Sequence, residues 1–297
     1  MTKIVSFILL LLLFRATPVT AGGILVIQSL QIKPYNEALQ GFMSVCAAKT
    51  KKLIGAELSA TEIVGNVRKN KPDLILAIGL DALTKVREIR DVPIVYLMVL
   101  NPQAAVPDAG NFTGVSMNIQ PERQLATLRQ VLPHARKIGI PFAPDKSGVF
   151  VRKAQNAASA IGIELLTIKV HNPRETAAAL DGMKGKIDAL WLPPDTTVVN
   201  PVTIDHLILT AIENRIPIYI FSEKYVEKGA LLSLEVNAHE AGIQAGEMAN
   251  RILAGASVQN IEKEDAREGI LTVNLIVAKK LGITIKSDAI KHAREIR

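Results

Sequence analysis

From residue 22 to the end of the chain, short apolar runs alternate with segments of helical period, and this alternation limits the fold more than any other feature. Apolar runs of this length are typical of buried strands. Strands that alternate with helices form right-handed βαβ units, so the sequence predicts an α/β fold with mainly parallel sheets. The expected strands are residues 24–28, 53–58, 73–78, 94–99, 112–116, 137–142, 164–170, 187–192 and 216–221, and the expected helices include 35–51, 61–70, 81–89, 122–132, 149–161, 173–183 and 201–214.

The alternation runs through two successive sets of about four to five βα units. Together they are more than one sheet of this length usually carries, so the sequence predicts two similar Rossmann-like lobes. No linker rich in glycine or proline separates the two sets. Short crossovers are therefore expected to join the lobes, with a ligand cleft between them.

Residues 1–21 have the pattern of a cleavable signal peptide. Lys3 precedes an apolar core over residues 4–14, and Val19-Thr20-Ala21 is a small-residue cleavage pattern. A transmembrane anchor is the alternative, but a bilayer requires about 20 apolar residues. No cysteine follows the apolar core, so a lipoprotein is not expected. We expect a mature chain that begins at Gly22 and is soluble in the periplasm.

The single cysteine and the mixed charges exclude some classes of protein. Cys46 cannot form an internal disulfide, and its place in a helical apolar pattern predicts a small buried side chain. The formal net charge is +7, but Asp and Glu lie among the Lys and Arg residues throughout the chain. This distribution indicates solvated faces and does not fit a nucleic-acid footprint.

The strand expected over residues 187–192 ends at Pro193-Pro194, which cannot donate to a sheet ladder. Asn200-Pro201 then has the pattern of an N-cap and first helical residue. Asp195, Thr196 and Thr197 therefore lie at the carboxyl end of a parallel strand, where open α/β sheets bind ligands. A solvated loop remains the alternative for these three residues.

Small or polar side chains also follow the other expected strands, often at the start of a helix whose N–H groups can hold an anion. Because carboxyl ends of parallel strands meet at one sheet edge, two facing lobes would bring these residues to one cleft. The residues predicted to contact a ligand besides Asp195, Thr196 and Thr197 are Gln28, Leu80, Asp81, Asn101, Ser147, Gly148, Ser222 and Glu223.

A family resemblance rests on several motifs in order along the chain. They are Pro-Pro-Asp-Thr-Thr at 193–197, Ile-Pro-Ile-Tyr-Ile-Phe-Ser-Glu at 216–223, Lys-Gly-Ala-Leu-Leu-Ser at 228–233 and the segment 242–255, with Lys-Pro-Asp-Leu-Ile-Leu-Ala at 71–77 and the closing segment 273–283. Over essentially the whole mature chain, the sequence resembles substrate-binding proteins of ABC transporters with a type I periplasmic-binding fold. The group with tryptophan and tyrosine binders is the most similar.

The resemblance implies a two-lobed clamp that closes on a small polar solute, an amino acid or a related compound, and delivers it to an ABC permease and its ATPase. The chain would cross between lobes three times, which gives lobe 1 residues 22–116 and 234–266 and lobe 2 residues 117–233 and 267–297. A monomer is implied. The resemblance also assigns the Asp195 loop, Ser147-Gly148 and Ser222-Glu223 to the ligand site.

Two positions depart from the pattern of amino-acid binders. Leu80-Asp81 replaces a run of small and hydroxyl residues after the third strand, and Asn101 replaces an acidic residue after the fourth. Asp81 would repel a ligand carboxylate, although it could equally be the N-cap of its helix. The sequence therefore leaves the solute unidentified.

Motifs for catalysis or cofactors are missing from the sequence. It contains no Gly-x-Gly-x-x-Gly after a strand, no P-loop and no Gly-x-Ser-x-Gly, and its five histidines lack metal-ligand spacing. We therefore expect no cofactor, no metal and no enzymatic activity. A sensory protein that docks on a membrane receptor or kinase uses the same fold and remains the alternative to transport.

Overall fold

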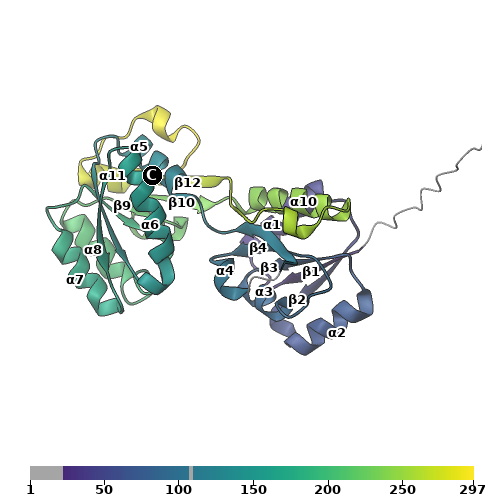
Figure 1. Ribbon diagram of the computed structural model, residues 1–297. Helices are drawn as coiled ribbons and strands as arrows, with labels where there is room; N and C mark the ends of the chain where they lie inside the picture. Colours follow the sequence, from purple (N-terminus) through teal and green to yellow (C-terminus); the bar gives the residue numbers. More distant parts are fainter. Residues whose placement is uncertain (1–22, 107–109) are drawn as a thin grey trace, which may run out of the picture.

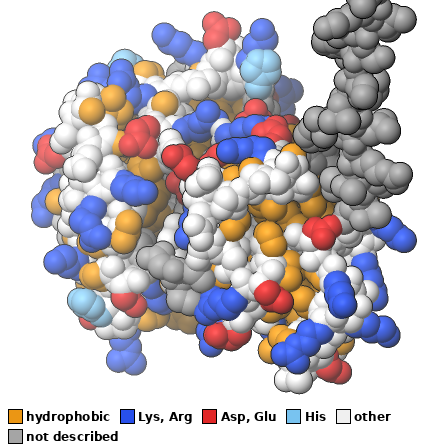
Figure 2. All heavy atoms as spheres, turned by 45° about the vertical axis from the view of Figure 1, so that its right-hand side comes forward, with side chains coloured by type: hydrophobic (Ala, Val, Ile, Leu, Met, Phe, Trp, Pro, Cys, Tyr) orange, Lys and Arg blue, Asp and Glu red, His pale blue; other side chains and the backbone are white. Residues whose placement is uncertain are grey.

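The computed structural model describes residues 23–106 and 110–297, which form two α/β lobes joined by short crossovers (Figure 1). The predicted signal peptide lies outside the described residues. Within them, no helix has the length and apolar character needed to cross a bilayer. On the face shown in Figure 2, Lys and Arg side chains are spread over both lobes with acidic side chains among them.

Lobe 1 is built on a six-stranded parallel sheet with the order β11-β5-β4-β3-β1-β2. Its strand side chains alternate between two apolar layers. One layer packs against α1 and α10, and the other against α2 and α3. The elements are β1 Ile24–Gln28, α1 Lys33–Val45, β2 Thr50–Ile54, η1 Gly55–Glu57, α2 Ala60–Asn70, β3 Leu74–Ile78, α3 Leu80–Val86, β4 Ile94–Val99, α4 Pro102–Ala105, β5 Phe112–Ser116, α10 Ala238–Leu253, η2 Val258–Asn260 and β11 Glu264–Asp265.

Lobe 2 is built on a seven-stranded sheet with the order β13-β12-β10-β9-β8-β6-β7, in which β12 is antiparallel to β10. Helices α5, α6 and α11 cover one face, and α7 and α8 cover the other. The elements are α5 Pro121–Val131, β6 Lys137–Phe142, α6 Pro144–Ala160, β7 Glu164–Lys169, α7 Pro173–Met183, β8 Ala189–Leu192, α8 Ile204–Glu213, β9 Ile218–Ile220, α9 Glu223–Lys228, β10 Leu232–Val236, β12 Gly269–Asn274, α11 Leu275–Leu281, η3 Ser287–Ile290 and β13 Arg294–Ile296.

Two helices of lobe 2 begin elsewhere than the sequence predicts. Helix α6 begins at Pro144 directly after its strand, so Ser147 lies in its first turns rather than in a loop. Helix α8 begins at Ile204, because the Asn200 side chain closes a turn by accepting from the N–H groups of Val202 and Thr203 instead of capping a helix. Both differences change which side chains reach the edge of the sheet.

Three crossovers join the lobes, at residues 117–120, 237 and 266–268. They run side by side, since the Ala266 N–H donates to the Asn118 carbonyl and the Asn237 N–H donates to that of Glu268. The expected start of the second lobe 1 segment, residue 234, falls inside β10, which pairs with β9 and β12 of lobe 2. Whether each lobe folds as an independent domain stays a prediction.

Helices α1 and α10 pack backbone to backbone. A Cβ atom at Gly242 would lie 2.0 Å from the Ala38 carbonyl oxygen, and one at Gly41 would lie 1.9 Å from that of His239. Only glycine fits at such a contact. The pair therefore forms one rigid layer over the lobe 1 sheet, and α10 presents its other side to the crossovers.

Candidate ligand-binding site

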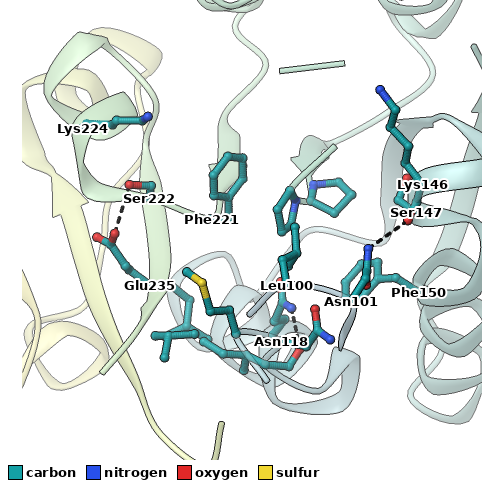
Figure 3. A pocket seen from close by; sticks show the side chains of 17 residues that line it. Leu100, Asn101, Asn118, Lys146, Ser147, Phe150, Phe221, Ser222, Lys224 and Glu235 are labelled. Carbon is teal, nitrogen blue, oxygen red and sulfur yellow. Dashed lines mark hydrogen bonds between the residues drawn. The ribbon is translucent and has the colours of Figure 1, made fainter. Parts of the chain in front are cut away.

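A cavity of about 370 Å³ lies between the lobes, beside the crossovers (Figure 3). This volume lies within the ordinary range of small-molecule sites. Both lobes and the first crossover contribute to its wall. The lining residues are Leu100, Asn101, Met117, Asn118, Ile119, Gln124, Lys146, Ser147, Phe150, Pro193, Pro194, Phe221, Ser222, Lys224, Leu234, Glu235 and Val236.

The apolar floor of the cavity follows from strand register in lobe 2. Trp191, Tyr219 and Leu232 are neighbours across β8, β9 and β10. Side chains two residues further on point to the same face of the sheet. Pro193, Phe221 and Leu234 therefore form the next layer, and all three line the cavity.

The layer beneath this floor is aromatic. Trp191 is 1% exposed, and its indole N–H donates to the Gln124 side-chain oxygen at 3.2 Å. Its ring stacks on Tyr219 at 5.9 Å between centroids and meets the edge of Phe150 at 5.4 Å. Phe150 is thus fixed from behind while it lines the cavity.

Glu235 is the one acidic residue among those lining the cavity. Its carboxylate is half-buried and accepts from the Ser222 hydroxyl at 3.1 Å and from the Glu223 N–H at 3.2 Å. These bonds fix its position at the start of α9 and leave further lone pairs for a ligand. Figure 3 shows Glu235 and Ser222 at one side of the cavity, with Lys224 near them.

Two lysines complete the charges of the cavity, and both have partners outside it. The Lys146 ammonium donates to the Thr196 hydroxyl at 2.8 Å, and that of Lys224 lies 4.7 Å from the centre of the Tyr225 ring. Figure 3 places Lys146 and Ser147 at the side opposite Glu235. Both ammonium groups are solvent-exposed and carried by flexible stems, so they can reorient toward an anionic group.

The lobe 1 wall depends on a bulge in β4. Register with β5 shifts between Leu97 and Val99, and Met98 between them has φ of +57°. Asn101 also has a left-handed backbone, with φ of +53°. A bulge bends a strand and redirects the side chains that follow it. Leu100 and Asn101 line the cavity, and the Asn101 amide donates across the cleft to the Lys146 carbonyl at 3.4 Å.

Of the residues predicted from the sequence to contact a ligand, Asn101, Ser147 and Ser222 line this cavity. Gly148 is buried in α6, and Glu223 pairs with Arg294 at 2.6 Å. Thr196 holds Lys146, and Thr197 is buried. None of these four residues lines the cavity.

Asp195 is only 3% exposed and does not line the cavity. Its carboxylate accepts from the Ala143 N–H at 2.7 Å, from the Thr197 N–H at 2.9 Å and from the Ser147 hydroxyl. The carboxylate therefore faces buried protein donors, which fits neither the predicted ligand contact nor a solvated loop. Asp195 instead fastens the loop after β8 to the start of α6, because three buried donors converge on it.

Apart from Asn101, the residues predicted in lobe 1 also lie outside the cavity. Gln28 is fully buried, and its amide donates to the Leu30 carbonyl at 2.7 Å and to the Asn36 side chain at 2.9 Å. Leu80 is exposed at the start of α3. Asp81 pairs with Lys85 at 2.9 Å. The negative charge of Asp81, which was expected to repel a ligand carboxylate, is thus paired with Lys85.

Sequence reasoning missed Phe150, Phe221 and Glu235. Phe150 follows Ser147 by three residues, so a helix that began at Pro144 would have indicated that both share a face. Glu235 lies near the end of a strand that the sequence analysis did not assign. Tyr35, another residue near the cleft edge of lobe 1, is half-buried against Gly79, and this burial raises its pKa.

The site can bind a small molecule but shows no grouping for metal chemistry. Within residues 23–106 and 110–297, no three His, Cys, Asp or Glu side chains gather as metal ligands would. An apolar slot with Phe150 and Phe221, one carboxylate and two mobile ammonium groups suits a ligand with a flat apolar part and a zwitterionic end.

Comparisons with known proteins identify the family and the fold of the chain. Residues 45–297 match the profile of a family described as ABC transporter substrate binding protein. A tyrosine-binding protein of Clostridioides difficile (strain R20291) is 28% identical over 235 residues, which are 76% of this chain and 68% of the relative.

Two solved structures share the fold. One is a ligand-free, open structure of a substrate binding protein with adhesive properties from Clostridium difficile, with a TM-score of 0.76 at 24% identity over 93% of this chain and 99% of that one. The other is an ABC domain in complex with L-Trp from Streptococcus pneumoniae, with a TM-score of 0.64 at 23% identity over the same shares. The two-lobed α/β fold expected from the sequence is confirmed.

Proposed function

The chain belongs to the ABC transporter substrate binding protein family, and from this we propose that it is the extracytoplasmic solute-binding component of an ABC importer. Its solute is an aromatic α-amino acid or a closely related compound. The lobes capture the solute by closing on it, and the protein then delivers it as a monomer to a membrane permease and its ATPase.

The observation that carries the ligand assignment is the position of Glu235 beside an aromatic slot. Its carboxylate has two protein donors and remains half-buried at the cavity wall. A ligand ammonium there would form a charge-assisted hydrogen bond, which is about twice as strong as a neutral one. Phe150 and Phe221 supply the apolar surface for a ring.

The ligand's carboxylate also has suitable donors. Lys146, Lys224 and the amides of Asn101 and Asn118 line the same cavity. The repulsion expected from Asp81 does not apply, since Asp81 pairs with Lys85 away from the cavity wall. The relatives named for tyrosine binding and for an L-Trp complex support the same ligand class.

Closure is supported by the distribution of the wall over both lobes. Asn101 of lobe 1 already reaches the first turn of α6 in lobe 2. A ligand that contacts both walls binds the closed form better than the open form, and it shifts the population accordingly. Small-angle scattering should show a smaller radius of gyration once the ligand saturates the protein.

Calorimetry with L-tryptophan and with indole-3-propionate, which lacks the ammonium, tests the ligand assignment. The wild type should prefer tryptophan. Glu235→Gln removes the charge but keeps one acceptor oxygen, and it should weaken tryptophan binding by about 10- to 150-fold, from a loss of about 1.5–3 kcal/mol. Its affinity for indole-3-propionate should not fall.

Glu227→Gln is the matched control, because Glu227 is an exposed acid on the nearby helix α9 and does not line the cavity. Equal binding of both compounds by the wild type, or an equal loss of both in Glu235→Gln, would refute the ammonium assignment. Transport itself is tested by uptake of labelled amino acid in cells with and without the chain.

A further inference from the structure

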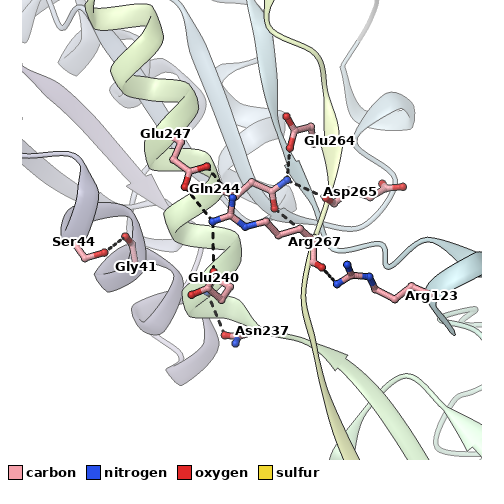
Figure 4. Close-up of polar contacts among 10 residues, drawn as sticks. All are labelled: Gly41, Ser44, Arg123, Asn237, Glu240, Gln244, Glu247, Glu264, Asp265 and Arg267. Carbon is pink, nitrogen blue, oxygen red and sulfur yellow. Dashed lines mark hydrogen bonds and ion pairs between the residues drawn. The ribbon is translucent and has the colours of Figure 1, made fainter. Parts of the chain in front are cut away.

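The third crossover, residues 266–268, is held on lobe 1 by three side chains of α10, Gln244, Glu247 and Glu240 (Figure 4). The buried Gln244 amide donates to the Asp265 carbonyl at 3.2 Å and accepts from the Arg267 N–H at 3.2 Å, so it grips the backbone on both sides of Ala266. Its amide also donates to the Glu264 carboxylate. The first half of the crossover is thus attached to lobe 1.

The Arg267 side chain adds a second attachment to the same helix. Its guanidinium donates to both carboxylate oxygens of Glu247, at 2.9 and 3.1 Å, and lies 3.5 Å from Glu240. Such a two-pronged Arg–carboxylate pair fixes geometry as well as adding energy. Figure 4 shows the guanidinium reaching from the crossover to α10.

The backbone of the same residue faces the other lobe. The Arg267 carbonyl accepts from the guanidinium of Arg123, an exposed residue on α5 of lobe 2. When the lobes rotate, either the attachments to α10 or this contact must yield. The contact with Arg123 is a single hydrogen bond at the surface, so it yields first.

We infer that Arg267 is a positioning residue of the hinge, which keeps the third crossover on lobe 1 so that the lobes bend between Arg267 and Gly269. This inference rests on the lobe closure proposed above. Gly269 is suited to this place, because a Cβ there would lie 2.8 Å from side-chain carbons of Leu234 and Ile119. The first and second crossovers bend with the third, since both are hydrogen-bonded to it.

The expected effect of Arg267 on binding follows from conformational freedom. Without the Arg267 side chain, Gln244 alone holds the crossover on α10, so the crossover has more freedom in the open form, and that freedom must be lost when the lobes close. Arg267→Ala should therefore weaken ligand binding although Arg267 does not line the cavity. We expect a loss of about two- to thirtyfold, the range found for residues that couple sites without touching ligand.

The test compares Arg267→Ala and Arg267→Lys with Arg251→Ala. Lysine keeps the positive charge but cannot form the two parallel hydrogen bonds of a guanidinium, so Arg267→Lys should lose less affinity than Arg267→Ala. Arg251 is an exposed arginine in the last turn of α10 and serves as the control. For each protein we would measure tryptophan affinity, the radius of gyration without ligand, hydrogen exchange at residues 266–269 and the melting temperature.

Faster exchange at residues 266–269, a larger unliganded radius of gyration and weaker binding in Arg267→Ala, with Arg251→Ala like the wild type, would support the inference. A lower melting temperature with unchanged exchange, radius and affinity would overturn it, because Arg267 would then be only structural. If Arg267→Ala does not fold, Glu247→Gln can replace it in the same measurements, because it weakens the ion pair between Arg267 and Glu247 by removing the carboxylate charge. Failure of the wild type to bind any amino acid would refute the proposed ligand, while exchange and scattering still test the hinge.

Discussion

Replacing Asp195 with Ala is expected to lower the free energy of unfolding strongly and to change the ligand affinity of the folded protein little. Three donors converge on the carboxylate: the N–H groups of Ala143 and Thr197 and the hydroxyl of Ser147. The Asp195 side chain is 3% exposed, so bulk water does not reach these donors to accept hydrogen bonds in place of the carboxylate. Substitution leaves buried donors without an acceptor.

The magnitude follows from those donors. Each buried donor that loses its partner costs about 1–3 kcal/mol. The Ser147 hydroxyl can turn to the Ala143 carbonyl, which already lies 3.4 Å away, so two donors rather than three remain unpaired. We therefore expect Asp195→Ala to lower the free energy of unfolding by about 2–5 kcal/mol. Asp195→Asn should lose less, because it keeps one carbonyl oxygen.

Urea denaturation of Asp195→Ala, Asp195→Asn and Asp145→Ala would measure these losses. Asp145 is an exposed acid in the first turn of α6, and its removal should cost under about 1 kcal/mol. Calorimetry on the folded fraction gives the ligand affinity. A stability within 1 kcal/mol of wild type, combined with at least a tenfold loss of affinity, would refute the structural role and return Asp195 to the ligand site.

Two further predictions concern lobe 1. Gly242→Ala should lower the free energy of unfolding by about 1–3 kcal/mol or more, because its Cβ would meet the Ala38 carbonyl oxygen at 2.0 Å. Gly65→Ala in α2 should instead raise the free energy of unfolding by about 0.5–1 kcal/mol, because its Cβ would meet nothing within 4 Å. Thermal melts compare the two variants. Bonds from the backbone and side chain of Ser59 lower the pKa of Glu62, so the capping box adds stability above the unfolded carboxyl's pKa and loses it as pH falls through the lowered value. Melts from pH 7 to pH 3 should therefore show the gap between wild type and Glu62→Gln narrowing in acid, and a constant gap would contradict this.

The sequence predicts the framework well where strands are buried and sharply bounded. The strands at 94–99, 112–116 and 137–142 and the helix at 173–183 have the predicted limits. The strand at 94–99 follows Pro93, and the helix at 173–183 follows the capping residue Asn172. Prediction failed at α6, because Pro144 begins a helix directly while the apolar period becomes visible only from Val149.

The site could be predicted less well, for reasons of side-chain direction. Asn101, Ser147 and Ser222, which follow strand ends, line the cavity, and their contact with a ligand stays a prediction. Sequence alone does not show that Asp195 turns inward to three donors rather than outward to the cleft. Nor does it show that a bulge at Met98 redirects the end of β4. Such outcomes depend on contacts between segments far apart in the chain.

The return of α10 to lobe 1 has a consequence for the order in which the protein can fold. During synthesis, strands β1 to β5 of the lobe 1 sheet emerge first, but the helix that covers one of its faces arrives only with residues 238–253. Phe42 and its apolar neighbours therefore lack their packing partners until most of lobe 2 has been made. Contacts across such long sequence separations slow folding. We expect refolding from denaturant to form the contacts of α1 with α10 late, and a nascent chain that ends before residue 238 to keep this apolar face exposed to chaperones.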